Sequence, residues 1–169
     1  MTEENRSYSI YKSNLGPIGI YWNSKGLFEI IILPENSKKQ NVSLPDPYKK
    51  LFDSFFTSHP QKYKIQLDIL NKNITVDNIK FQFSDSPDSH IKIYYELLKV
   101  NSGSVISYGS LAEKAGYKNA ARMAGTAMAK NPFPLIIPCH RVILSSGKIG
   151  NYSPGPEIKI KLLQQEGAL

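Results

Sequence analysis

The single cysteine of the chain stands in a short run of residues that can carry out nucleophilic chemistry. Cys139 lies between Pro138 and the basic pair His140-Arg141. A thiol in an electropositive setting favours the thiolate, a soft nucleophile suited to attack on carbon. A water molecule can relay the proton to the imidazole, which needs an orienting carboxylate, and Glu166 is a candidate. The alternative is a buried, inert cysteine beside an incidental histidine.

A second feature is a pair of short helices joined by a tight turn. Ser107 is a preferred N-cap for a helix over Tyr108 to Lys114 that ends at Gly116, and residues 119–129 are rich in strong helix formers. This pattern predicts a helix-turn-helix. Its second helix exposes small residues and Arg122, which suits shape-driven docking in the minor groove better than reading bases in the major groove. The alternative is an alanine-rich helix packed tightly on its neighbours.

A DNA-binding element beside a reactive cysteine indicates chemistry on a nucleobase. Such a base must first leave the duplex stack. Arg122 is suited to fill the gap that base flipping leaves behind.

The stretch from Gly103 to Gly167 closely resembles the O6-alkylguanine-DNA alkyltransferases, also called methylated-DNA–protein-cysteine methyltransferases. In the first half of the chain the resemblance is weaker and is limited to two short segments, Leu15-Gly16-Pro17-Ile18-Gly19-Ile20 and Gly26-Leu27. The motifs of the family follow in order, with little insertion or deletion: Val105-Ile106-Ser107-Tyr108, Ala120-Ala121-Arg122, Asn131-Pro132, Ile136-Ile137-Pro138-Cys139-His140-Arg141-Val142, Gly150-Asn151-Tyr152-Ser153 and Glu166-Gly167.

The resemblance implies a role for each matching residue. Cys139 resembles the alkyl acceptor, His140 the base that takes its proton through water, and Glu166 the carboxylate partner of that base. Tyr108 resembles the phenol that hydrogen-bonds the guanine and helps the leaving base accept a proton; the alternative is that it only packs. The residues that the resemblance implies for binding the guanine are Val142, Tyr152 and Ser153. Asn131 resembles the residue that braces the turn before the active site; the alternative is that it only caps a turn. The residues implied for contacting the DNA are Arg122, Ala120, Ala121 and Tyr108.

The resemblance also implies what the protein does. It predicts DNA repair by a single-turnover, suicide transfer of an alkyl (methyl) group from O6-alkylguanine in double-stranded DNA to Cys139. The thioether product is stable, so each molecule acts once. No metal or organic cofactor is implied, and a chain with one cysteine lacks the N-terminal zinc site of some family members.

The implied fold is α+β, in two domains. Residues 1–84 are expected to form an N-terminal, ribonuclease H-like α/β domain with a small antiparallel sheet. Residues 85–169 are expected to form a helical, winged-helix-like C-terminal domain that carries the helix-turn-helix and the alkyl acceptor. A monomer is expected.

Two positions depart from the family pattern. Pro154 follows Tyr152-Ser153, where glycine or arginine is common, and proline would stiffen the pocket loop. Residues 86–91 lack the phenylalanine usual near the start of the C-terminal domain.

The composition fits this interpretation without requiring it. The 169 residues carry a formal net charge of +7, which favours a polyanionic partner, nucleic acid first and anionic membrane second, although many small proteins are basic for solubility alone. A lone thiol fits a reducing compartment. The polar N-terminus lacks the apolar core of a signal peptide, and no apolar run is long enough to span a bilayer. We therefore expect a soluble, cytoplasmic protein.

Periodicity predicts the elements that position these residues. In the first half, strands are expected over residues 8–11, 18–22 and 27–33 as an antiparallel meander, a helix over 48–57, and strand or irregular structure over 65–69 and 74–83. In the second half, helices are expected to begin near Ser86-Pro87-Asp88 and end at Asn101-Ser102-Gly103, and to run over 108–114, 119–129 and 157–166.

Three other functions remain open from sequence. An alkyltransferase-like protein would bind the same lesions without chemistry, but typically carries tryptophan in place of Cys139. A helix-turn-helix regulator would leave the run from Pro138 to Arg141 unexplained. A cysteine hydrolase would turn over repeatedly and need an oxyanion hole, which the sequence does not locate.

Overall fold

The computed structural model describes residues 6–34, 36–37, 43–57 and 64–169. The chain divides into two compact units, Met1–Ser84 and Asp85–Leu169. Both mix helices and strands, which confirms the predicted α+β class. The elements of the first unit are β1 (Ser7–Ser13), β2 (Gly16–Asn23), β3 (Gly26–Ile32), α1 (Asp46–Thr57), β4 (Ile65–Asp68), β5 (Asn73–Val76) and β6 (Ile79–Gln82).

The antiparallel meander expected at the start of the chain is present. Strand β2 pairs antiparallel with both β1 and β3. Gly26, which opens β3, has a φ of +132°, and a Cβ there would lie 2.5 Å from the Lys80 carbonyl oxygen. Glycine at this position therefore allows β3 and β6 to come together.

The sheet continues beyond the meander. It is rich in antiparallel pairs, as predicted, but it has six strands in the order β1-β2-β3-β6-β5-β4, and β3 pairs with β6 in parallel. The stretch 74–83, read from sequence as one segment, folds as a hairpin. Its turn residues Asp77 and Asn78 have φ values of 46° and 67°, and two positive φ angles are what a two-residue hairpin turn requires.

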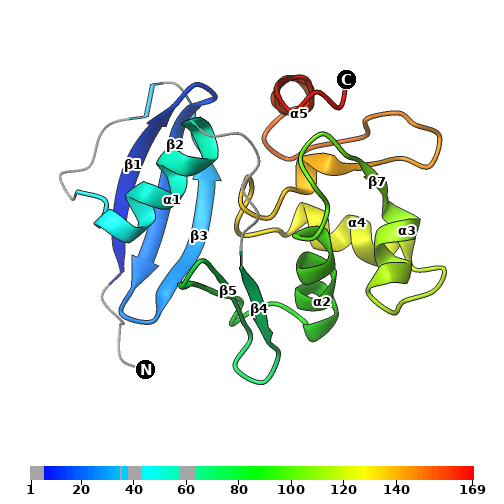
Figure 1. Ribbon diagram of the computed structural model, residues 1–169, viewed down its shortest axis with the longest axis horizontal. Coiled ribbons are helices and arrows are strands. Elements are labelled where there is room, and N and C mark those ends of the chain that lie inside the picture. The colour runs from blue at the N-terminus through cyan, green and yellow to red at the C-terminus, as the bar shows by residue number, and fades with distance from the viewer. Residues whose placement is uncertain (1–5, 35, 38–42, 58–63) are drawn as a thin grey trace. The chain divides into compact units, whose positions relative to one another are not determined.

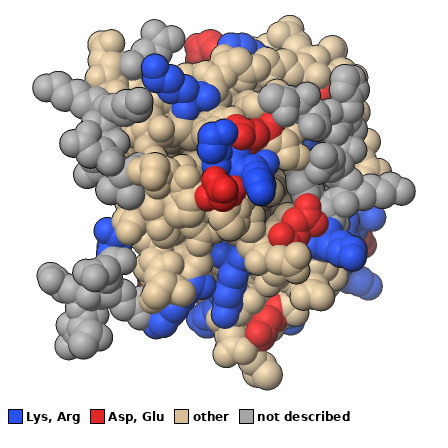
Figure 2. All heavy atoms as spheres, turned by 60° about the vertical axis from the view of Figure 1, so that its left-hand side comes forward, with Lys and Arg blue, Asp and Glu red and all other residues tan. Residues whose placement is uncertain are grey.

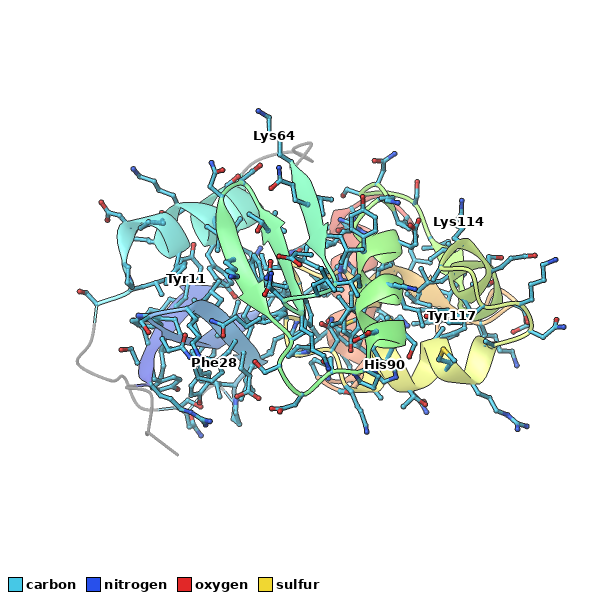
Figure 3. All side chains as sticks on the ribbon, turned by 90° about the horizontal axis from the view of Figure 1, so that it is seen from below. Tyr11, Phe28, Lys64, His90, Lys114 and Tyr117 are labelled. Atoms are coloured by element: carbon cyan, nitrogen blue, oxygen red, sulfur yellow. The ribbon has the colours of Figure 1, made fainter. Side chains whose placement is uncertain are left out.

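Helix α1 covers one face of this sheet (Figure 1). Its ring contacts fix it there: Tyr48 lies 5.9 Å from Trp22, and Phe52 lies 5.5 Å from Tyr11, measured between ring centroids. Figure 3 shows Tyr11 on the side of α1 and Phe28 on the opposite side. The helix thus buries the apolar side chains that alternate along the strands.

The second unit contains α2 (Asp88–Leu97), β7 (Ile106–Ser107), α3 (Tyr108–Lys114), α4 (Ala121–Ala129), the 3-10 helix η1 (Cys139–Arg141), β8 (Val142–Ile143) and α5 (Pro156–Gln165). Helix α3 has the predicted bounds, and the Ser107 hydroxyl accepts a hydrogen bond from the Ser110 amide at 3.1 Å as its N-cap. Helix α4 begins two residues later than predicted. Asn119 has a φ of 57°, a left-handed conformation that cannot start an α-helix.

Strands β7 and β8 link the helix-turn-helix to the cysteine. They pair in parallel, Ile106 with Val142 and Ser107 with Ile143. The N-terminus of α3 is therefore held next to the segment that directly follows η1.

Charge and hydropathy add two observations. On the face that Figure 2 shows, basic and acidic side chains lie side by side, so the net positive charge is not gathered there in one patch. In the part of the chain that the structure describes, no helix combines the length and the hydropathy needed to cross a membrane.

Candidate active site

The reactive segment is one turn of 3-10 helix. The Cys139 amide donates to the Ile137 carbonyl at 2.7 Å, and the Arg141 amide donates to the Pro138 carbonyl at 2.9 Å. Cys139 is 5% exposed and His140 is fully buried. The turn therefore holds the thiol at the edge of the core, with little access for bulk water.

Glu166, at the C-cap of α5, ties the two residues after the cysteine together. Its Oε1 lies 3.1 Å from His140 Nε2 and accepts from Arg141 Nη2 at 2.7 Å, while its Oε2 accepts from Arg141 Nε at 3.0 Å. The third arm of Arg141 donates from Nη1 to the Val100 carbonyl at 2.6 Å. The sequence thus folds so that a carboxylate 26 residues away orients the imidazole.

The protonation states of this cluster follow from its contacts. Burial opposes the charge of Glu166, but hydrogen bonds and charges from His140 and Arg141 outweigh burial and lower its pKa to about 2. Burial lowers the pKa of His140, and the Glu166 contact offsets only part of that effect. Because a carboxylate only accepts hydrogen bonds, His140 Nε2 carries the proton and Nδ1 keeps its lone pair. Nδ1 is buried, with no hydrogen-bond partner among the described residues, and is suited to act as a base.

The groups around Cys139 shift the pKa of its thiol in opposite directions. Burial raises the pKa of Cys139, while hydrogen bonding from Asn131 and Tyr152 and the charge of Lys159 lower it. The Tyr152 hydroxyl is buried, and the nearby Cys139 adds to the effect of burial in raising its pKa. These groups therefore favour the thiolate over what burial alone would allow.

Asn131 braces the turn that leads to η1. Its Nδ2 donates to the Ile137 carbonyl at 2.9 Å, and its Oδ1 accepts from the Phe133 amide at 3.0 Å. Within this turn Leu135 has a φ of 77°, an uncommon conformation for a side chain of this size. The side chain of Asn131 thus ties the two ends of the irregular turn together through their backbone groups.

We expect Asn131→Ala to lower the free energy of unfolding by about 2 kcal/mol, because it removes the two hydrogen bonds that the side chain makes to the backbone of Phe133 and Ile137. Urea denaturation monitored by circular dichroism measures this. Asn101→Ala, at an exposed position before β7, is the control and should stay within about 0.5 kcal/mol of the parent chain. Equal stability of the two variants would contradict this role for Asn131.

Tyr108 and the residues after η1 complete the surroundings of Cys139. Burial, and then the nearby Cys139, raise the pKa of Tyr108, so its side chain stays a phenol that can donate a hydrogen bond. A Cβ at Gly150 would lie 3.9 Å from the Tyr108 hydroxyl, which places the loop after β8 next to it. Val142 is buried and Ser153 is exposed.

Three of the four DNA-facing residues predicted from sequence lie at the start of α4, and the fourth, Tyr108, opens α3. Ala120 is the half-buried N-cap, and Ala121 and Arg122 are exposed. The other side of the helix is anchored, because the buried Tyr94 hydroxyl donates to the Ala127 carbonyl at 2.8 Å. The exposed side is therefore formed by small residues and one arginine.

The sequence analysis did not predict the roles of two residues in this site. Arg141 was read only as a nearby positive charge, whereas it makes a two-pronged contact with Glu166. Lys159 was not singled out, although it is fully buried. The spacing of the sequence could have indicated this. Residues 159, 162, 163 and 166 recur at helical intervals and therefore lie on one face of the helix, which is the buried face.

No group of three or more histidine, cysteine or acidic side chains in the described ranges could hold a metal ion.

Comparisons with known proteins point to one family. The sequence model described as "6-O-methylguanine DNA methyltransferase, DNA binding domain" matches residues 88–168. A protein of Methanothermobacter thermautotrophicus named methylated-DNA–protein-cysteine methyltransferase is 33% identical over 151 residues, covering 89% of this chain and 79% of that protein. The human protein of the same name is 53% identical over 77 residues, which cover 45% of this chain and 37% of the human one.

Solved structures agree. The crystal structure of Mycobacterium tuberculosis OGT in complex with DNA matches with a TM-score of 0.68 at 27% identity, covering 95% of this chain and 92% of that chain. The similarity therefore extends over both units.

Proposed function

This chain belongs to the methylated-DNA–protein-cysteine methyltransferase family, and from that premise we propose that it repairs DNA by moving an alkyl group from O6 of guanine to Cys139. The observation that carries the proposal is the buried thiol beside a neutral imidazole whose far nitrogen is held by Glu166. A thiol with this neighbour can be deprotonated on demand and attack carbon.

The proposed step balances as follows. The Cys139 thiol gives its proton to His140 Nδ1 through a water molecule, and the resulting thiolate attacks the alkyl carbon in line. The carbon–O6 bond breaks with its electron pair on oxygen, and the guanine leaves. Tyr108 hydrogen-bonds the base and helps it accept a proton. The new carbon–sulfur bond is a thioether with no leaving group for water to displace, so each molecule reacts once.

We propose the remaining site residues as binding groups. Val142, Tyr152 and Ser153 would line the guanine pocket, and Asn131 would hold the turn that carries the thiol. The chemistry requires nothing beyond these side chains and water, so no cofactor is proposed.

We infer that the partner is double-stranded DNA, and that α4 contacts it. The similarity to a chain crystallised with DNA supports this, as does the exposure of Arg122 on a helix otherwise lined by small residues. A base inside a duplex cannot reach a buried thiol, so the lesion must be flipped out. Ala120 and Ala121 would allow a close approach, and Arg122 would enter the duplex in place of the base.

We also propose the finer description of the fold. In it, residues 1–84 form a ribonuclease H-like α/β domain, and residues 85–169 form a winged-helix-like domain that binds DNA and accepts the alkyl group. The protein would act as a monomer, because one chain carries every group that the step requires.

A lesion-binding protein without chemistry is not favoured. The relatives that match most of this chain are named as methyltransferases, and the acceptor position here is cysteine.

The experiment that tests the proposed function is the intact mass of the protein after incubation with a duplex that contains one O6-methylguanine. The expected gain is one methylene group per molecule, reached once and not exceeded with excess DNA. Tight binding of the lesion with an unchanged mass would replace the proposal with a binding function.

We expect Arg122→Ala to slow methyl transfer from duplex DNA by about 10- to 100-fold, because a flipped base costs a few kcal/mol and the arginine would supply part of it. Transfer from free O6-benzylguanine, which needs no flipping, should be unchanged. Lys92→Ala, an exposed position on α2, removes the same charge and is the control. Equal slowing with both substrates would contradict a role for Arg122 in flipping.

A further inference from the structure

Three aromatic side chains lie next to one another on neighbouring strands of the six-stranded sheet. The register of β1 and β2 pairs Tyr8 with Tyr21, and Phe28 belongs to β3. The ring centroids of Tyr8 and Tyr21 are 4.4 Å apart, and those of Tyr21 and Phe28 are 6.1 Å apart. We call these three residues the aromatic row, because their rings follow one another across the strands.

The aromatic row lies on the face of the sheet that α1 does not cover. Trp22 packs its ring on α1, so its neighbour Tyr21 faces away from that helix. Figure 3 shows Phe28 on this second side, where the described part of the first unit has no helix. A Cβ at Gly19 would lie 3.0 Å from the Tyr8 ring and 3.4 Å from the Tyr21 ring. The two rings therefore lie over this glycine, and all three members of the row are only half-buried.

The charges around the aromatic row are mostly positive. The exposed Arg6 holds its guanidinium carbon 5.3 Å from the centre of the Phe28 ring. Lys12 is exposed on the same side of β1 as the row, and Lys80 is exposed between two buried neighbours on β6. Glu29 is the one acidic residue in β1, β2 and β3. Three cationic side chains against one carboxylate favour an anionic partner.

A single strand of nucleic acid has the chemistry that fits both features. Its unpaired bases stack on aromatic rings, while its phosphates bind cations beside them. We propose that this face of the sheet binds single-stranded DNA, with bases on the aromatic row and phosphates at Arg6 and Lys12. A duplex does not fit the row, because its bases are already stacked on one another. This binding goes beyond alkyl transfer and does not depend on it, since the acceptor cysteine belongs to the other unit.

The test is the affinity of the full chain for a fluorescent oligothymidylate of about 12 nucleotides, measured by anisotropy. An oligomer of the same length made of abasic sites keeps the phosphates and lacks the bases. We expect Tyr21→Leu to weaken binding of the thymidylate about 10-fold and to leave binding of the abasic oligomer unchanged. Tyr21→Phe keeps the ring and should bind like the parent. Tyr48→Leu, which removes a ring from α1 on the covered side, is the control and should also bind like the parent.

The salt dependence of the same binding tests the charges. We expect Arg6→Gln to make the slope of log affinity against log salt shallower by about 0.7, the value for one phosphate contact on a single strand. Lys50→Gln removes an exposed charge from α1 and should leave the slope unchanged. Glu29→Gln should tighten binding, because it removes the carboxylate that repels phosphate.

The outcomes separate stacking from a structural role of the rings, since cross-strand aromatic pairs also stabilise sheets. Equal weakening with both oligomers, or in Tyr48→Leu, would overturn the proposal. If Tyr21→Leu does not fold, as thermal melting would show, Tyr8→Leu replaces it with the same expected result. Tighter binding of an oligouridylate would overturn the assignment to DNA. A self-association that Tyr21→Leu abolishes, with DNA affinity unchanged, would assign the face to a second copy of the chain.

Ultraviolet crosslinking of the oligothymidylate, followed by peptide mass mapping, locates the contact. We expect crosslinked peptides from β1, β2 and β3, and crosslinks confined to residues 85–169 would overturn the proposal. Because these oligomers contain no alkylated guanine, the result is independent of whether the parent protein takes methyl groups from O6-methylguanine. Failure of that transfer would contradict the proposed function alone.

Discussion

Cys139→Ala is expected to gain no mass from duplex DNA that contains O6-methylguanine, at any incubation time. The chain has one cysteine, so no second thiol can replace it. Alanine leaves the 3-10 turn intact, because its backbone hydrogen bonds do not involve the side chain. Lesion binding should therefore survive, and a titration with labelled duplex measures it beside the intact mass.

Cys139→Ser provides the sharper control. It restores a nucleophile of similar shape, but a hydroxyl is far less acidic than a thiol, and His140 cannot ionise it to a useful extent. We expect no transfer to serine either, with binding equal to that of Cys139→Ala. A methylated product in either variant would show that another residue accepts the alkyl group and would contradict the proposed chemistry.

Local signals in the sequence predicted the local structure. Ser107 gave the start of α3, and alternating apolar residues gave the meander that forms β1 to β3. The hairpin of β5 and β6 was missed because apolar residues flank Asp77-Asn78 so closely that the stretch reads as one strand. The turn is recognisable only when two residues that tolerate positive φ are weighed as a hairpin signal.

Without the resemblance, the candidate site could be predicted only for residues that are adjacent in the sequence and therefore also close in space. Cys139 and His140 are adjacent, and they were found from their chemistry. The contact that orients His140 spans 26 residues, to Glu166. Those that hold the next residue, Arg141, span 25 residues to Glu166 and 41 to Val100. Glu166 was a candidate because the base needs an orienting acid, and the family resemblance assigned it that role. Lys159 was not predicted, because a lysine on an apolar helix face normally extends to solvent.

Glu166→Gln is expected to weaken both the fold and the chemistry. The amide can still accept from His140, but its NH2 group would face the guanidinium of Arg141, and the positive charge would lose its partner. The carboxylate is only 12% exposed, and breaking a buried ion pair of this kind lowers the free energy of unfolding by about 3 kcal/mol. Methyl transfer should slow by about 100-fold, because the imidazole loses the anion that stabilises its protonated form.

The pH dependence of stability identifies the source of this loss. The pKa of Glu166 is lowered from 4.5 to about 2 in the folded chain, so its contribution is complete above pH 4.5 and disappears as the pH falls to about 2. Glutamine does not titrate, so the stability difference between Glu166→Gln and the parent should be largest near neutral pH and shrink across this range. Glu157→Gln, at an exposed position in the first turn of α5, should leave stability and transfer unchanged. A difference that stays constant from pH 7 to pH 2 would mean that the shape of the side chain, and not its charge, holds His140 and Arg141 in place.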